Sequence, residues 1–100
     1  MTNASAKIPT ETVEDICRLL RDRGAPTWGE ITWEYQDDFE YVLFVIELKA
    51  IPLHRNAPDR MYAYNLLNTR IPRKPSGDDS WMVVFKHNET VCDSLMNDMS

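Results

Sequence analysis

The side chains that could do acid–base or nucleophilic chemistry are few and lie far apart in the sequence. His54 and His87 could each titrate near neutral pH, but neither has a sequence neighbour that suggests a catalytic triad or a metal cage. Cys17 and Cys92 share no metal-ligand spacing, and each falls on the apolar side of an expected helix, where a free thiol behaves as a small hydrophobe. We therefore expect no catalytic residue and no cofactor, and a protein that is not an enzyme.

Two aspartate pairs, Asp37-Asp38 and Asp78-Asp79, are the remaining candidates for chemistry. Paired carboxylates could hold a divalent cation. Aspartate is common in turns for another reason, because its side chain accepts hydrogen bonds from the backbone there. We therefore expect no metal. The chain has only three glycines, which also excludes a glycine-rich phosphate loop.

Length and composition indicate one globular domain. The chain has 100 residues, of which 43% are hydrophobic and 27% charged, as in ordinary folded domains. We expect a single domain over residues 8–99 and a flexible N-terminus over residues 1–7. The first residues lack the apolar core of a secretory signal, and the apolar run 41–46 is far shorter than the roughly 20 residues that span a bilayer. We expect a cytoplasmic protein without a membrane contact.

The clearest secondary-structure element in the sequence is a helix over 10–23. Val13, Ile16, Cys17 and Leu20 recur at helical spacing,. Gly24 follows and can end the helix in a left-handed conformation.

A β-hairpin comes next. Residues 30–35 alternate between apolar and polar side chains, as in a strand with one wet face,. Residues 36–38 turn the chain into a second strand over 39–49, which is apolar on both faces. Such a strand needs a layer on each side, or it contributes to an interface.

The remaining elements are less regular. Residues 61–70 fit either a strand, with Tyr62 and Tyr64 on one face, or a helix that has Pro58 in its first turn; we favour the strand, because tyrosine-rich segments suit a pleated surface. Residues 80–86 alternate as a strand. Asn88 could cap a short helix over 89–99, with Val91, Cys92, Leu95, Met96 and Met99 on one side.

These elements predict an α+β fold: a single-layer antiparallel sheet of three to four strands, with an N-terminal helix and a short C-terminal helix packed on it. The two helices would cover both faces of the long strand. Alternatively the C-terminal helix is loose, and one face of the sheet stays open for a partner.

The net charge of −5 hides a segregation along the chain. Residues 25–48 contain six acidic residues and no basic one, whereas residues 49–75 contain six basic residues and one acidic residue. The acidic residues of the hairpin would create a local negative potential, which speeds encounter with a cationic partner. Alternatively they only keep the hairpin soluble and prevent edge-to-edge pairing of strands.

The basic segment has the ingredients of a single-stranded nucleic-acid surface, since Arg55, Arg60, Arg70 and Arg73 are interleaved with tyrosines,. The sequence pI of about 4.9 argues against nucleic acid. A homodimer, with basic loops docked on the acidic hairpin, would use the same residues.

We therefore expect a small acidic protein-binding module of the inhibitor, immunity-protein or anti-defence type, which occludes a basic partner protein. An assembly factor or chaperone that uses an open apolar sheet face is the alternative. The expected partner-binding residues are the hairpin acids and three aromatic anchors: Glu30, Glu34, Asp37, Asp38, Glu40, Trp28, Trp33 and Tyr62.

Overall fold

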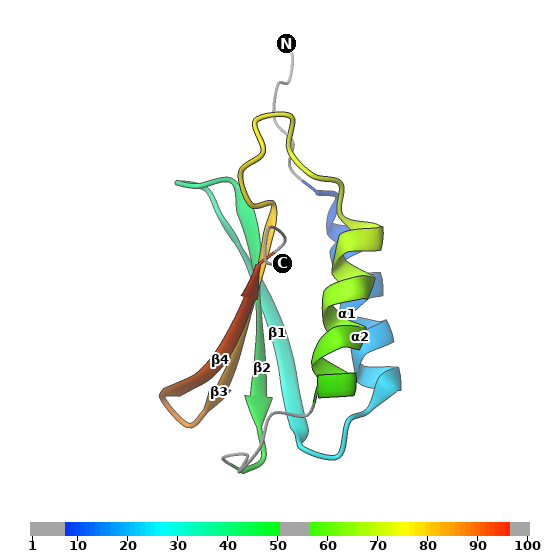
Figure 1. The fold of residues 1–100 in the computed structure, drawn as a ribbon, viewed down its shortest axis with the longest axis vertical. Helices are drawn as coiled ribbons and strands as arrows, with labels where there is room; N and C mark the ends of the chain where they lie inside the picture. Colours follow the sequence, from blue (N-terminus) through cyan, green and yellow to red (C-terminus); the bar gives the residue numbers. More distant parts are fainter. Residues whose placement is uncertain (1–7, 51–56, 97–100) are drawn as a thin grey trace.

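The computed structural model describes residues 8–50 and 57–96, which form two helices and four strands (Figure 1). In chain order the elements are α1 (Thr10–Arg23), β1 (Trp28–Gln36), β2 (Tyr41–Leu48), α2 (Ala57–Arg70), β3 (Trp81–His87) and β4 (Thr90–Met96). The expected α+β fold with a single sheet is confirmed. The expected flexible N-terminus, His54 and Arg55 lie outside the described residues.

Helix α1 has the predicted boundaries. Its buried residues are Val13, Ile16, Cys17 and Leu20, which are those that the helical spacing placed on one side. Gly24 ends the helix at φ 59° and ψ 51°, and its backbone N–H donates to the Leu20 carbonyl. Only glycine adopts this left-handed conformation without a steric cost from Cβ.

The prediction of a strand over 61–70 is wrong, because these residues belong to α2. The residues buried here recur every four positions, at Asp59, Ala63, Leu67 and Ile71, so one narrow stripe of the helix faces the sheet. Pro58 lies in the first helical turn, where its missing N–H removes no hydrogen bond. The tyrosines that suggested a strand lie beside this stripe and are half-buried.

Helix α2 changes the sheet from the expected antiparallel arrangement to a mixed one. The strand order is β1-β2-β3-β4, and β2 and β3 run parallel, with Val42 opposite Trp81 and Ile46 opposite Phe85. A strand over 61–70 would have returned the chain as a meander. A helix instead carries the chain back to the end where β2 began, so β3 must run in the same direction.

The prediction of a C-terminal helix is also wrong. Residues 90–96 form β4, which pairs antiparallel with β3 and places Leu95 opposite Val83. Asn88 does not cap a helix. It adopts φ 57° in the short turn between the two strands, a conformation that asparagine tolerates better than most residues. A register shift next to Phe85 inserts one extra residue into β4, which breaks the alternation that would have indicated a strand.

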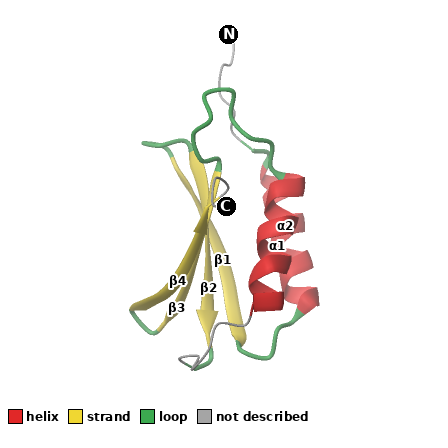
Figure 2. Ribbon diagram, viewed as in Figure 1, coloured by secondary structure: helices red, strands yellow, loops and turns green. Residues whose placement is uncertain are grey.

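Both helices pack on one face of the sheet (Figure 2). Phe44, Ile46, Trp81 and Val83 point toward them and are fully buried, together with Leu67 of α2. Among the described residues no helix lies over the other face. The expectation that two helices cover both faces is therefore wrong, and the alternative with a loose C-terminal helix is wrong in its helix, since residues 90–96 form β4.

Candidate functional site

The acidic residues of the hairpin turn are exposed to solvent. Asp37, Asp38 and Glu40 lie in the turn that joins β1 to β2, and Glu34 lies on the open face of β1 opposite Leu43. None of these four forms a salt bridge to another described residue. Other acids do: Asp59 binds Arg23 at 2.9 Å, and Asp93 binds Arg60.

Glu30 is exposed as well, but it lies toward the other end of β1. At about 3.4 Å per residue it stands roughly 24 Å from Asp37 along the strand, well beyond the Debye length of about 8 Å at physiological salt. The structure therefore brings four of the five predicted acids to one end of the hairpin and leaves Glu30 apart. We call Glu34, Asp37, Asp38 and Glu40 the acidic turn.

The negative potential of the acidic turn reaches a neighbouring side chain. The pKa of Tyr35 is raised, first because the half-buried phenol is partly desolvated, and then because Glu40 and Asp37 disfavour the phenolate. Glu40 itself adopts φ 53°, a left-handed conformation that is uncommon for a residue other than glycine.

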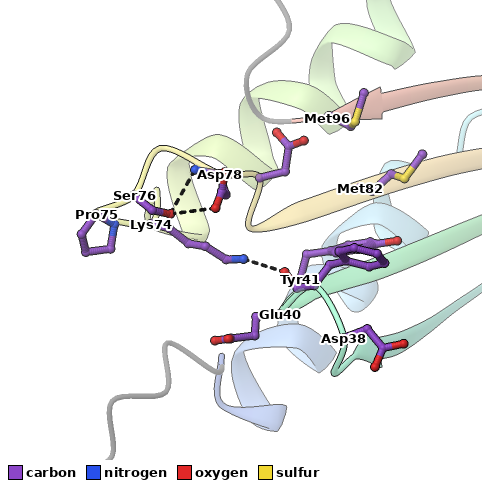
Figure 3. A pocket seen from close by; sticks show the side chains of 11 residues that line it. Asp38, Glu40, Tyr41, Lys74, Pro75, Ser76, Asp78, Met82 and Met96 are labelled. Atoms are coloured by element: carbon purple, nitrogen blue, oxygen red, sulfur yellow. Dashed lines mark hydrogen bonds between the residues drawn. The ribbon is translucent and has the colours of Figure 1, made fainter.

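A pocket of about 750 Å³ lies between the acidic turn and the loop that precedes β3 (Figure 3). The Lys74 ammonium donates to the Phe39 carbonyl at 2.8 Å, which ties this loop to the turn. In the same loop Ser76 Oγ donates to Asp78 Oδ2 at 3.1 Å. The pocket is lined by the turn, the loop and the adjoining ends of β3 and β4: Asp38, Phe39, Glu40, Tyr41, Lys74, Pro75, Ser76, Asp78, Asp79, Met82 and Met96.

The pocket brings Asp38, one member of the first aspartate pair, close to both members of the second pair, about 40 residues further along the sequence. Asp38 comes from the turn, while Asp78 and Asp79 come from the loop. Within the described part of the chain, no group of three or more histidine, cysteine, aspartate or glutamate side chains could hold a metal ion.

The open face of the sheet continues from this pocket and is apolar at its centre, with polar residues around it: Thr32, Glu34, Glu47, Lys86 and Ser94. Leu43, Met82 and Met96 lie in one row across β2, β3 and β4, and Val45 and Val84 lie in the next. All five side chains are only half-buried. Phe39, beside the row, is 73% exposed.

Of the aromatic residues that the sequence suggested as anchors, Trp28 is buried, and Trp33 and Tyr62 are half-buried. Trp28 is buried and packs on Phe85, and Trp33 is packed against the core. Tyr62 is half-buried on α2, with the Arg23 guanidinium 5.1 Å from its ring centre. The exposed aromatic residue of the hairpin is Phe39, which the sequence pattern predicts to begin the second strand. The sequence did carry one sign of this exposure, because Phe39 lies between Asp38 and Glu40 in an acidic turn.

The other chemical candidates are dispersed. The ring nitrogen Nδ1 of His87 lies 3.1 Å from the Leu48 carbonyl, at the opposite end of β3 from the pocket. Both cysteines are free, Cys17 buried and Cys92 half-buried, and burial raises the pKa of the Cys17 thiol. In the basic segment Arg60 is held by Asp93, while Arg70 and Arg73 are exposed.

No protein-family model, curated protein or solved structure matches this chain. In the ranges that the structure describes, neither helix has the length and apolar character needed to cross a membrane. The function is therefore inferred from the acidic turn, the pocket and the open face.

Proposed function

We propose that this protein is a non-enzymatic protein-binding module that occludes a basic partner, in the manner of inhibitors and immunity proteins. One observation carries the proposal. The acidic turn, whose four carboxylates form no ion pair with the described residues, is contiguous with a sheet face that has an apolar centre and that no described helix covers.

The acidic turn would act on the rate of encounter. Four exposed carboxylates at one end of a hairpin produce a potential that attracts a basic surface, and such steering speeds association by about one to three orders of magnitude at low salt. Its effect falls as salt screens the charges.

The open face would supply the desolvated contact that slows dissociation. A sheet of four strands about 4.8 Å apart, each about seven residues long, presents a face of roughly 450 Å²,. A stable interface buries about 800 Å² on each partner. The partner must therefore extend beyond this sheet face, and the acidic turn with its pocket is the adjoining surface.

A second candidate function is an assembly factor or chaperone that binds apolar segments on the open face. The half-buried methionines Met82 and Met96 favour it, because methionine surfaces adapt to different apolar partners,. Binding of that kind would depend little on the acidic turn or on salt.

The test begins with the partner, isolated from the native host by affinity purification and identified by mass spectrometry. Association rates are then measured for the wild type and for the variant Asp37→Lys/Asp38→Lys/Glu40→Lys. We expect the reversal to slow association at least tenfold at low salt, and by less at high salt, because the steering field is inverted.

A matched control carries the same charge change away from the acidic turn. Glu14, Asp22 and Glu89 are all exposed, and Glu14→Lys/Asp22→Lys/Glu89→Lys should slow association much less. Equal rates for the wild type and the turn variant would contradict the proposal and favour the assembly-factor alternative.

A further inference from the structure

We propose that the pocket beside the acidic turn binds an arginine side chain of the partner, presented on an extended segment that lies along the open sheet face. This inference rests on the proposed function and specifies the chemistry that the partner presents.

The charges that line the pocket favour a cation. Asp38, Glu40, Asp78 and Asp79 line it, and among the described lining residues Lys74 is the one that is basic. The Lys74 ammonium is engaged by the Phe39 carbonyl at 2.8 Å. An anionic ligand would therefore meet an excess of carboxylates, whereas a guanidinium would meet acceptors for its N–H groups.

The apolar walls favour a cation with a long aliphatic stem and a planar head. The Phe39 and Tyr41 rings lie 6.4 Å apart at an interplanar angle of 36°, and Phe39 is 73% exposed. Met82 and Met96 continue the wall onto the sheet. Arginine can stack its guanidinium on an aromatic ring and donate two parallel hydrogen bonds to a carboxylate, whereas lysine offers a compact charge with neither geometry.

The loop side of the pocket is held in place within the chain. Besides the contact of Lys74 with Phe39, the Asp78 backbone N–H donates to Ser76 Oγ at 3.3 Å, and Gly77 takes φ 87°, a conformation that few other residues adopt,. The pocket is partly open to solvent, and its volume of about 750 Å³ leaves room for more than one side chain. We therefore expect the residues next to the arginine to enter as well.

The experiment is an NMR titration of the isotopically labelled full chain with the peptide acetyl-Gly-Ala-Arg-Ala-Gly-amide. Matched peptides carry lysine or citrulline, the neutral analogue of arginine, at the centre. We expect the arginine peptide to shift the amide signals of Phe39, Glu40 and Asp78 and the methyl signals of Met82 and Met96. It should bind several-fold more tightly than the lysine peptide, and the citrulline peptide should give no saturable shifts.

Two variants with equal charge change, and a third that removes the Phe39 ring, test the pocket. Asp38→Asn/Glu40→Gln removes two lining carboxylates and should weaken arginine binding at least fivefold, and Phe39→Ala should weaken it as well. Glu14→Gln/Glu89→Gln removes two exposed carboxylates elsewhere and should change binding less than twofold. The peptide comparison on the wild type decides the question if a variant does not fold.

Equal binding of the arginine and citrulline peptides, or arginine-induced shifts that map outside the pocket, would overturn the inference. The proposed function fails by a different result. If the pocket takes no arginine but charge reversal at the acidic turn still slows association, steering survives without the pocket. If the pocket takes arginine but reversal leaves association unchanged, the acidic turn does not steer the partner.

Discussion

At the scale of single residues, Tyr35 provides an internal probe of the acidic turn that needs no partner. Its pKa is raised by burial, then by Glu40 and Asp37. We expect Asp37→Asn/Glu40→Gln to lower the pKa of Tyr35, although burial should still hold it above the usual value near 10. A ¹³C NMR titration of the tyrosine Cζ atom measures it.

The sign of the associated stability change follows from linkage. Since the folded state favours the protonated phenol, the contribution of Tyr35 to stability is complete below pH 10 and is lost as the pH rises through the folded-state pKa,. The control is Glu30→Gln, which removes a carboxylate at the far end of β1 and should leave the pKa of Tyr35 unchanged. An unaltered pKa of Tyr35 in the turn variant would mean that the charges of Asp37 and Glu40 do not act on the phenol.

The sequence could predict the acids of this site but not its aromatic residue. Charged side chains in a turn are almost always solvated, so composition and spacing alone placed Asp37, Asp38 and Glu40 on the surface. Aromatic exposure depends on packing partners. Trp28 is buried because Phe85, 57 positions further along the chain, packs against it, and no local pattern carries that information.

At the scale of elements, the sharpest test asks whether residues 90–96 pack on the sheet as the edge strand β4. Leu95 is 2% exposed and contributes to the core, whereas Val91 in the same strand is 59% exposed. We expect Leu95→Ala to lower the free energy of unfolding by about 2–5 kcal/mol, because it leaves a cavity in the core. Val91→Ala should change it by less than about 0.5 kcal/mol. Urea denaturation of both variants measures the difference. Equal effects would mean that residues 90–96 do not pack as an edge strand.

The elements with strong local sequence patterns were predicted correctly. Helix α1 has four correctly spaced core residues and a terminal glycine; β1 alternates between apolar and polar residues, and β2 is an apolar run that follows an acidic turn. Helix α2 and β4 lack such signals. Only one residue in four of α2 is buried, and the extra residue in β4 breaks its period. In both segments the contacts with the rest of the sheet decide between helix and strand.

At the scale of the whole molecule, those two elements decide which surface is available. With α2 as a helix, the chain crosses over the sheet on the side of α1, and both helices cover the same face (Figure 1). With β4 as a strand, the described part of the chain has no third helix for the other face. The apolar residues of β2 predicted that each of its faces packs against another layer or a partner. Which face α2 covers as it connects β2 to β3 depends on the complete topology.

Val83 and Val84 test this one-sided architecture with a single chemical change on neighbouring residues. Val83 faces the helices and is fully buried, and Val84 lies on the open face and is half-buried. We expect Val83→Thr to lower the free energy of unfolding by about 1–3 kcal/mol, because its hydroxyl enters a core without a hydrogen-bond partner. Val84→Thr should cost less than about 1 kcal/mol, since water reaches that face. Urea denaturation measures both variants.

The two variants should have effects in the opposite order on binding to the identified partner. Among folded molecules, Val84→Thr should weaken the complex, because it removes apolar contact from the interface, whereas Val83→Thr should leave the affinity unchanged. Equal destabilisation by the two variants would mean that both sheet faces are covered within the protein, and the open face would then not be available to a partner.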